Sequence, residues 1–184
     1  MISICLIYSN GRLSQATQTV EYLSCLPYIS TYDLIQVCDG TPNFSFNGFK
    51  QVVVERKNKG LFCRADLWNN GIAAAKKRVV VILDCDRIAH PDFFGAAATL
   101  QHKQVLYCPC LYQLLKRESL KSIVSHFDGV VPLTFARPDF RVTFNNGTIR
   151  PAKNPMSGCV AFLKSDYLCT DGLSDDFVGW GFND

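Results

Sequence analysis

The feature of this sequence that most constrains its fold is an unbroken apolar run over residues 79–83, followed directly by Asp84-Cys85-Asp86. The run reads Val-Val-Val-Ile-Leu, and a series of β-branched residues is typical of a strand that is buried on both faces. Such strands belong to parallel sheets with helices on both sides, and ligands bind at their carboxyl ends. We therefore expect Asp84 and Asp86 to emerge together at a ligand-binding edge.

The spacing of these two acids favours a divalent cation. Two carboxylates separated by one residue can hold Mg²⁺ or Mn²⁺ bound to substrate phosphates, because these cations prefer carboxylate oxygens. The same pattern also occurs in solvated turns at strand ends, and the spacing alone leaves both interpretations open.

The first half of the chain alternates between strand and helix patterns. Strands are predicted for residues 2–8, 32–38, 51–55 and 79–83, and helices for residues 14–26 and 64–76. Strand-helix-strand repetition with short connections predicts an α/β fold, with a mostly parallel, doubly wound sheet flanked by helices. The ligand edge of that sheet would collect Asn10, Asp39 and the Asp84/Asp86 pair.

Beyond residue 91 the pattern is less regular. Helices are predicted for residues 93–102 and 116–125, and strands for residues 105–115 and 156–163. Residues 128–155 are rich in Pro, Gly and Asn, which predicts extended loops or hairpins over one side of the site.

The composition narrows the class of protein. A chain of 184 residues with 48% hydrophobic and 19% charged residues is expected to form one globular domain. Its net charge of +3 is small and its basic residues are scattered, which disfavours a nucleic-acid partner. The one tight basic run, Lys76-Lys77-Arg78, is expected at a solvated helix end. No stretch reaches the ~18 apolar residues of a membrane span, so we expect a soluble or peripheral protein.

The nine cysteines and the N-terminal sequence point to a reducing compartment, the cytoplasm. The N-terminus lacks the basic flank and cleavage site of a signal peptide. Cys5, Cys38, Cys85 and Cys159 lie singly in apolar segments, which predicts small buried hydrophobic residues. The Cys-Pro-Cys motif at residues 108–110 has no partner pair at zinc-finger distance, which disfavours a metal or redox site.

Four motifs together resemble a known group of enzymes. They are Leu61-Phe62-Cys63-Arg64-Ala65-Asp66-Leu67-Trp68-Asn69-Asn70-Gly71, Leu83-Asp84-Cys85-Asp86, Ser157-Gly158-Cys159-Val160-Ala161-Phe162 and Gly179-Trp180-Gly181-Phe182-Asn183-Asp184. Their order and spacing resemble those of the β-1,4-galactosyltransferases and of the related bacterial chondroitin polymerase and polypeptide N-acetylgalactosaminyltransferase catalytic domains. The resemblance implies the GT-A fold, a UDP-sugar donor and usually Mn²⁺, or Mg²⁺. It implies a single domain over residues 1–184, with a nucleotide-binding half (1–90) and an acceptor-side half (91–184).

The resemblance assigns donor-binding or metal-binding roles to five residues. It implies that Asp39 contacts the uracil or the ribose, although an Asp-Gly turn explains the same residue. Phe62 would stack on the base and Arg64 would meet the nucleotide, whereas a phenylalanine such as Phe62, taken singly, is more often a core residue. Asp86 would be the main metal ligand, while Asp84 would contact the metal or a ribose or sugar hydroxyl.

Two further residues follow the acidic motif closely. Arg87 and His90 could neutralise phosphate, and the alternative for each is an ordinary surface position.

The end of the chain carries the implied acceptor side. The resemblance places Gly158, Trp180, Gly181 and Asn183 against donor or acceptor sugar, and Asp184 as the base for the attacking hydroxyl. Asn183 stands where the relatives usually carry glutamate. The chain ends before the further acids and the histidine ligand of the relatives, so we expect a domain truncated at its C-terminus.

The function implied is metal-dependent, inverting transfer of galactose or an N-acetylhexosamine from a UDP-sugar to a hydroxyl of a glycan or glycosylated acceptor. The alternative is a catalytically impaired nucleotide-sugar or carbohydrate-binding module, suggested by Asn183 and by the missing tail. A sugar-nucleotide-forming nucleotidyltransferase is disfavoured, because the loop Ser9-Asn10-Gly11-Arg12 has one glycine and one basic residue for a triphosphate.

Overall fold

The computed structural model describes residues 1–40, 44–54, 62–108, 111–113, 142–145, 148–151 and 158–174. Its centre is a six-stranded sheet in the order β3-β2-β1-β4-β10-β6. These strands are β1 (Ile2–Ser9), β2 (Asp33–Asp39), β3 (Lys50–Val54), β4 (Val79–Asp84), β6 (Val105–Tyr107) and β10 (Cys159–Leu163). Two small sheets pair β5 (Arg87–Ala89) with β7 (Leu111–Gln113), and β8 (Val142–Asn145) with β9 (Thr148–Pro151).

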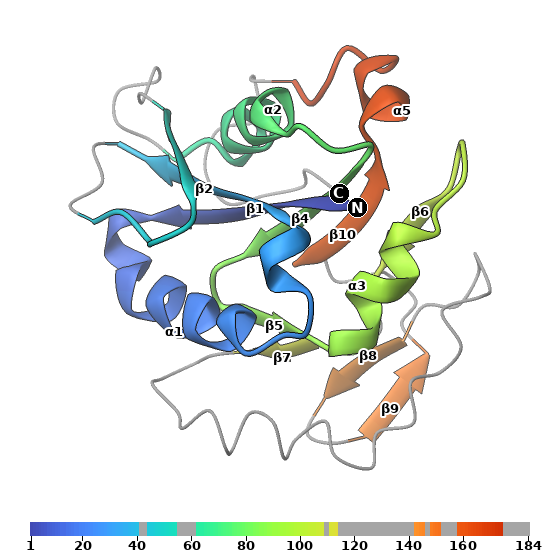
Figure 1. The fold of residues 1–184 in the computed structure, drawn as a ribbon, viewed down its shortest axis with the longest axis horizontal. Coiled ribbons are helices and arrows are strands. Elements are labelled where there is room, and N and C mark those ends of the chain that lie inside the picture. The colour runs from blue at the N-terminus through green and yellow to red at the C-terminus, as the bar shows by residue number, and fades with distance from the viewer. Residues whose placement is uncertain are drawn as a thin grey trace.

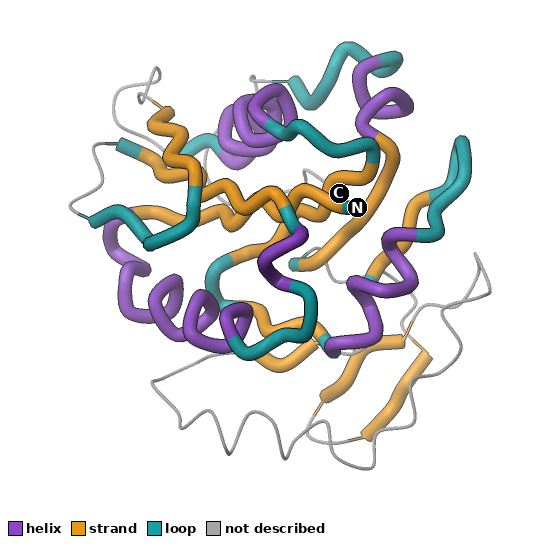
Figure 2. Tube along the Cα trace, viewed as in Figure 1, coloured by secondary structure: helices purple, strands orange, loops and turns teal. Residues whose placement is uncertain are grey.

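Helices cover both faces of the central sheet. The helices are α1 (Leu13–Ser24), α2 (Arg64–Ala74), α3 (Pro91–Ala98) and α5 (Lys164–Leu168), with short 3₁₀ turns η1 (Asn10–Arg12) and η2 (Ile29–Thr31). In Figure 1, α2 and α5 lie on one side of the sheet, and α1 and α3 lie on the other. Figure 2 shows the alternation of strand and helix along the first half of the chain. The predicted α/β architecture is confirmed.

The sheet is mixed rather than wholly parallel. Strand β1 pairs in parallel with β2 and β4, and β2 pairs in parallel with β3. Strand β10 runs antiparallel to both β4 and β6. The mostly parallel sheet is therefore confirmed, with one strand, β10, that runs opposite to the other five.

Most elements that the sequence predicts are present, with ends that differ by a few residues. The single strand predicted for residues 105–115 is wrong, because β6 and β7 are separate and belong to different sheets. Pro109 stands between them, and a proline has no N–H to donate to a strand ladder. The β8–β9 hairpin agrees with the hairpins predicted within residues 128–155. The helix predicted for residues 116–125 lies outside the described residues.

Two apolar cores explain why the central strands are apolar without interruption. Ile4, Leu6 and Tyr8 of β1 point into a core closed by α1 and α3, whereas Cys5 and Ile7 point into a second core closed by α2. Strands between two cores must present apolar side chains to both faces.

The predicted burial of four cysteines, Cys5, Cys38, Cys85 and Cys159, is also confirmed. Within the described ranges, no helix combines the length and the apolar character that crossing a membrane requires.

Candidate functional site

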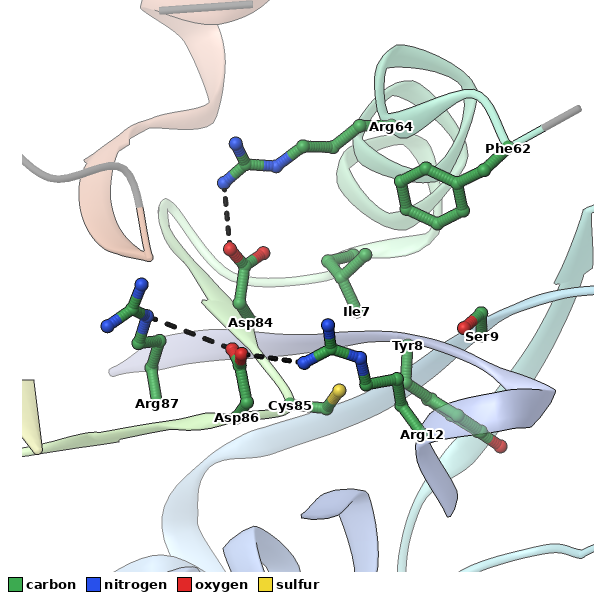
Figure 3. A pocket seen from close by; sticks show the side chains of 10 residues that line it. All are labelled: Ile7, Tyr8, Ser9, Arg12, Phe62, Arg64, Asp84, Cys85, Asp86 and Arg87. Carbon is green, nitrogen blue, oxygen red and sulfur yellow. Dashed lines mark hydrogen bonds and ion pairs between the residues drawn. The ribbon is translucent and has the colours of Figure 1, made fainter. Parts of the chain in front are cut away.

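A pocket of about 320 Å³ opens where β1 and β4 end. Ile7 of β1 is the register partner of Asp84 of β4, so the chain segments that leave the two strands start side by side. The walls come from the end of β1, the η1 turn, the start of α2 and the residues after β4 (Figure 3). The pocket thus lies at the carboxyl edge of the parallel strands, where the sequence predicts it.

Both acids of the Asp84-Cys85-Asp86 motif lie in this pocket and form ion pairs with arginines. Arg64 Nη2 lies 2.9 Å from Asp84 Oδ2, and Arg12 Nη1 lies 2.9 Å from Asp86 Oδ2. A third arginine, Arg87, places its Nε 3.8 Å from Asp86 Oδ1. Figure 3 shows Asp86 between Arg12 and Arg87, and Arg64 above Asp84. The solvated-turn interpretation of this motif therefore does not hold.

Burial changes the acidity of Asp84. Its surroundings remove water from the carboxylate and raise the pKa of Asp84 to about 6, while the positive charge of Arg64 opposes that increase. The carboxyl is consequently close to its protonation midpoint at mildly acidic pH. Raised carboxyl pKa values of this kind are common in functional sites.

Side chains of α1 form hydrogen bonds with the backbone of the acidic motif and of the segment after it. Thr19 is fully buried, and its hydroxyl donates to the Cys85 carbonyl at 2.7 Å. Tyr22, one turn later, donates to the Ala89 carbonyl at 2.8 Å. The Cys85 N–H donates to the Ile7 carbonyl at 3.0 Å, which continues the strand pairing beyond β4. These bonds fix the backbone on which the two acids stand.

Two further backbone regions place the remaining pocket residues. Arg64 is the first residue of α2, and its guanidinium carbon lies 5.2 Å from the ring centre of Trp68 one turn later, which is a cation–π contact. Gly158, immediately before β10, accepts a hydrogen bond from the Asp84 N–H at 2.8 Å. The Arg87 side chain lies directly against Gly158.

The structure brings together several of the predicted donor-side residues. Phe62, Arg64, Asp84 and Asp86 all line the pocket. Phe62 also packs against the core under α2, as its alternative interpretation has it, and its stacking on a base remains a prediction.

Asp39 stands apart from the pocket walls. It ends β2 beside Ser9 and is only 4% exposed, and it does not line this pocket. Gly40 follows with a φ of +79°, which agrees with the alternative of an Asp-Gly turn. A nucleotide contact by Asp39 remains a prediction.

Arg87 and His90 are not the surface residues of the alternative interpretation. The Arg87 side chain is 14% exposed and lines the pocket. His90 is buried at the start of α3, where its Nδ1 accepts from the Asp92 N–H at 3.2 Å. Burial also lowers the pKa of His90, which favours the neutral ring that this bond needs. His90 therefore caps a helix.

The predicted acceptor side is largely outside the described residues. Trp180, Gly181, Asn183 and Asp184 belong to that part of the chain, and their roles remain predictions. Gly158 is described, and it contacts Asp84 and Arg87, while its predicted role against a sugar remains a prediction.

Two site residues were missed by the sequence analysis. Arg12 was weighed only as a triphosphate ligand, although a basic residue just after a strand end was a usable signal for this edge. Thr19 shares the buried face of α1 with Ala16 and Leu23. A hydroxyl on such an apolar face requires a hydrogen-bond partner, which was the signal for its role.

The site offers two carboxylates to a cation. Across the described ranges, no group of three or more His, Cys, Asp or Glu side chains is arranged to hold a metal ion. Any cation at Asp84 and Asp86 would need further oxygen ligands from substrate and water.

Comparisons with known proteins identify the fold. No protein-family model matches the chain, and no curated protein sequence matches it. Among solved structures, TarS from S. aureus (residues 1–349) is 14% identical over 95% of this chain and 50% of that chain, with a TM-score of 0.60. The Pyrobaculum calidifontis mannosyltransferase PcManGT, in complex with GDP-Man and Mn²⁺, is 14% identical over 95% and 48%, with a TM-score of 0.54.

The catalytic domain of Drosophila β-1,4-galactosyltransferase 7, in complex with xylobiose, is 13% identical over 98% of this chain and 56% of that chain. Its TM-score is 0.51. The chain spans about half the length of the solved structures that it matches. At these identities the likeness shows the fold, and the predicted GT-A fold is confirmed.

Proposed function

We propose that this chain is a glycosyltransferase domain that binds a UDP-sugar in the pocket after β4. It transfers the sugar, galactose or an N-acetylhexosamine, to a hydroxyl of a glycan or glycosylated acceptor, with inversion. One observation carries the proposal, namely the two strand-end acids and three arginines that line one pocket at the carboxyl edge of a GT-A sheet. The complexes of the similar structures with GDP-Man and Mn²⁺ and with xylobiose support it.

The pocket has separate regions for an aromatic base and for phosphate. Phe62 and Arg87 lie on opposite sides of it in Figure 3, with the acids and the other arginines in the same pocket. We infer that Phe62 stacks on the base and that the diphosphate lies toward the charged side chains. Asp39 would accept a hydrogen bond from the uracil ring or the ribose.

A divalent cation, Mn²⁺ or Mg²⁺, fits the donor set of this pocket. Asp86 and Asp84 would hold it through carboxylate oxygens, which such cations prefer, and phosphate and water oxygens would complete its ligands. When bound, it would neutralise negative charge on the leaving UDP. Arg12 and Arg64 would then exchange their present carboxylate partners for phosphate oxygens.

The acceptor chemistry is assigned to the end of the chain. Asp184 would take the proton from the attacking hydroxyl, a form of catalysis that typically contributes ~10²- to 10⁴-fold in rate. Trp180, Gly181 and Asn183 would contact the sugars.

The cysteine content supports a cytoplasmic location.

Incubation with Mn²⁺ and a panel of UDP-sugars, with UDP release by slow hydrolysis as the signal, tests the proposal without an acceptor. We expect release from at least one donor and loss of release on addition of a chelator. Asp184→Asn should keep donor binding and reduce transfer to an acceptor by ~10²-fold or more. A chain that binds no UDP or UDP-sugar with or without Mn²⁺ contradicts the proposal, and binding without any turnover favours the binding-module alternative.

A further inference from the structure

We propose that Arg87 is a donor-binding residue whose guanidinium contacts the diphosphate, and that Gly158 positions Arg87 for that contact. The inference rests on the proposed function of the same pocket. It assigns a phosphate ligand beyond the acidic motif and gives Gly158 a role that acts through another side chain.

The hydrogen-bonding state of Arg87 supports this role. Its Nε is buried and has no hydrogen-bond partner in the part of the chain that the structure describes. The nearest carboxylate oxygen, Asp86 Oδ1, is 3.8 Å away, which is beyond hydrogen-bond distance. Arg12 and Arg64 each place an Nη atom 2.9 Å from a carboxylate oxygen, which is within hydrogen-bond distance. A buried donor without an acceptor is costly, and a diphosphate oxygen would supply the acceptor.

The charge of the pocket points to an anionic ligand. Its charged walls consist of three arginines and two aspartates, which leaves one positive charge in excess when both acids are ionised. Arg64 pairs with Asp84, while Arg12 and Arg87 share Asp86, so the two acids leave one positive charge on this side of the pocket unmatched. Guanidinium groups bind phosphate through two parallel hydrogen bonds, which makes an arginine well suited to this position.

The absence of a side chain at Gly158 leaves the space that the Arg87 side chain occupies. A Cβ at Gly158 would stand 2.8 Å from Arg87 Cγ and 3.1 Å from Arg87 Nε, and real Cβ atoms essentially never approach closer than 3.0 Å. The backbone there cannot retreat easily, because the Gly158 carbonyl accepts from the Asp84 N–H at 2.8 Å. Any larger residue at position 158 must therefore displace the Arg87 side chain.

A purely structural role for Arg87 makes a different prediction. If Arg87 served only to neutralise Asp86, its loss would change stability or act through the cation at Asp86, and UDP affinity would then change only when Mn²⁺ is present. A diphosphate contact instead affects UDP and leaves uridine binding nearly unchanged. Affinities for uridine, UMP and UDP therefore separate the two roles.

The test measures those three affinities by calorimetry, with Mn²⁺ and again with a chelator, for the parent chain and for Arg87→Met, and a direct contact lowers UDP affinity in both conditions. Methionine keeps the packing against Gly158 and removes every hydrogen-bond donor. We expect UDP affinity to fall by about 10- to 100-fold, as for a lost charged hydrogen bond, and uridine affinity to change less than about twofold. Arg78→Met is the matched control, because Arg78 is exposed just before the opposite end of β4.

Gly158→Ala tests the positioning role in a double-mutant cycle. It should lower UDP affinity several-fold in the parent chain and have no further effect in the Arg87→Met background. An equal loss in both backgrounds shows that Gly158 does not act through Arg87. Thermal unfolding of each variant checks that it is folded.

A second variant keeps the test decisive if Arg87→Met does not fold. Arg87→Lys retains the charge but loses the planar fork, and we expect a UDP affinity between those of the parent and of Arg87→Met. UDP affinity equal to the parent's in Arg87→Met, or in Arg87→Lys when that variant is used, overturns the inference alone. A parent chain that binds no UDP overturns the proposed function, and the inference with it.

Discussion

The two ends of the parallel strands satisfy their polar groups in different ways. At the amino ends, the Ser3 hydroxyl donates to Asp33 at 2.7 Å, and the backbone N–H of Lys76 donates to the same carboxylate at 2.8 Å. The Lys77 N–H donates to Ser3 Oγ at 3.0 Å. At the carboxyl ends, Asp84 and Asp86 are paired with arginine side chains.

This difference separates a structural network from a binding site. Backbone N–H groups in a packed fold cannot turn to another partner, so the carboxylate of Asp33 is committed to the fold. An arginine side chain has several rotatable bonds and can exchange one anion for another. The arginine side chains at the carboxyl edge can therefore turn from their carboxylate partners to a phosphate ligand.

The largest effect is expected from Asp86→Ala. Removing this carboxylate should lower UDP affinity in the presence of Mn²⁺ by at least about 100-fold, because loss of even the groups that support metal ligands costs 10- to 100-fold. Calorimetric titration with and without chelator measures it. Asp84→Ala should cost less, and Asp33→Ala should leave the affinity unchanged. Equal UDP affinity with and without chelator in the parent chain would remove the metal-site prediction.

Asp33→Ala should show the opposite pattern. It leaves the fully buried Ser3 hydroxyl without its acceptor and the Lys76 N–H with only the longer bond to Ser3 Oγ at 3.2 Å, so the free energy of unfolding should fall by about 1–3 kcal/mol. Urea titration followed by circular dichroism measures the loss. Asp33→Asn keeps one acceptor oxygen and should lose less. A loss of UDP affinity in folded Asp33→Ala would show that the two ends are not independent.

The sequence predicted the amino-terminal half of the fold and the position of the acidic motif for a clear reason. An apolar run such as residues 79–83 reports burial on both faces, and the residues after it must then emerge at the strand's end. It does not report direction, so the antiparallel pairing of β10 with β4 was not predicted. Apolar periodicity is the same for a strand running either way.

Contacts across long stretches of sequence were also beyond prediction. Arg12 and Asp86 are 74 residues apart, and Arg64 and Asp84 are 20 apart. Their pairing depends on how the η1 turn and the start of α2 are placed, which no local pattern encodes. The Arg64 side chain is only 15% exposed and contacts Trp68. Truncating it should therefore cost more stability than the ~0.5 kcal/mol of a surface residue.

Thr19→Val tests the hydrogen bond between α1 and the backbone of the acidic motif, and its effect should be smaller than that of Asp33→Ala. Valine has nearly the same shape but leaves the Cys85 carbonyl without the hydroxyl that donates to it at 2.7 Å. We expect a loss of about 1 kcal/mol in the free energy of unfolding and a UDP affinity reduced a few-fold. Thr19→Ser, which keeps the hydroxyl, is the control. A reduced affinity in Thr19→Ser as well would attribute the effect to packing.

The smallest effect concerns His90, which lies near the ligand edge in sequence but has a structural role. Its pKa is lowered by burial, so the unfolded chain binds a proton more readily than the folded chain does. The stability that neutral His90 contributes is therefore present above pH ~6.5, the pKa of an unperturbed histidine, and is lost as the pH falls below it. His90→Asn keeps a helix cap that does not titrate, since asparagine is a good N-cap residue.

Asp84 changes stability with pH in the opposite direction, so the comparison must be made between variants. Because the pKa of Asp84 is raised to about 6, its contribution favours the folded chain as the pH falls toward 4. That contribution is common to the parent chain and His90→Asn and cancels in their difference. Between pH 7.5 and 5.5 the difference in the free energy of unfolding should move by about 1 kcal/mol in favour of His90→Asn, the value of one helix cap. A difference that stays constant over this range would show that His90 does not cap α3 as the neutral ring.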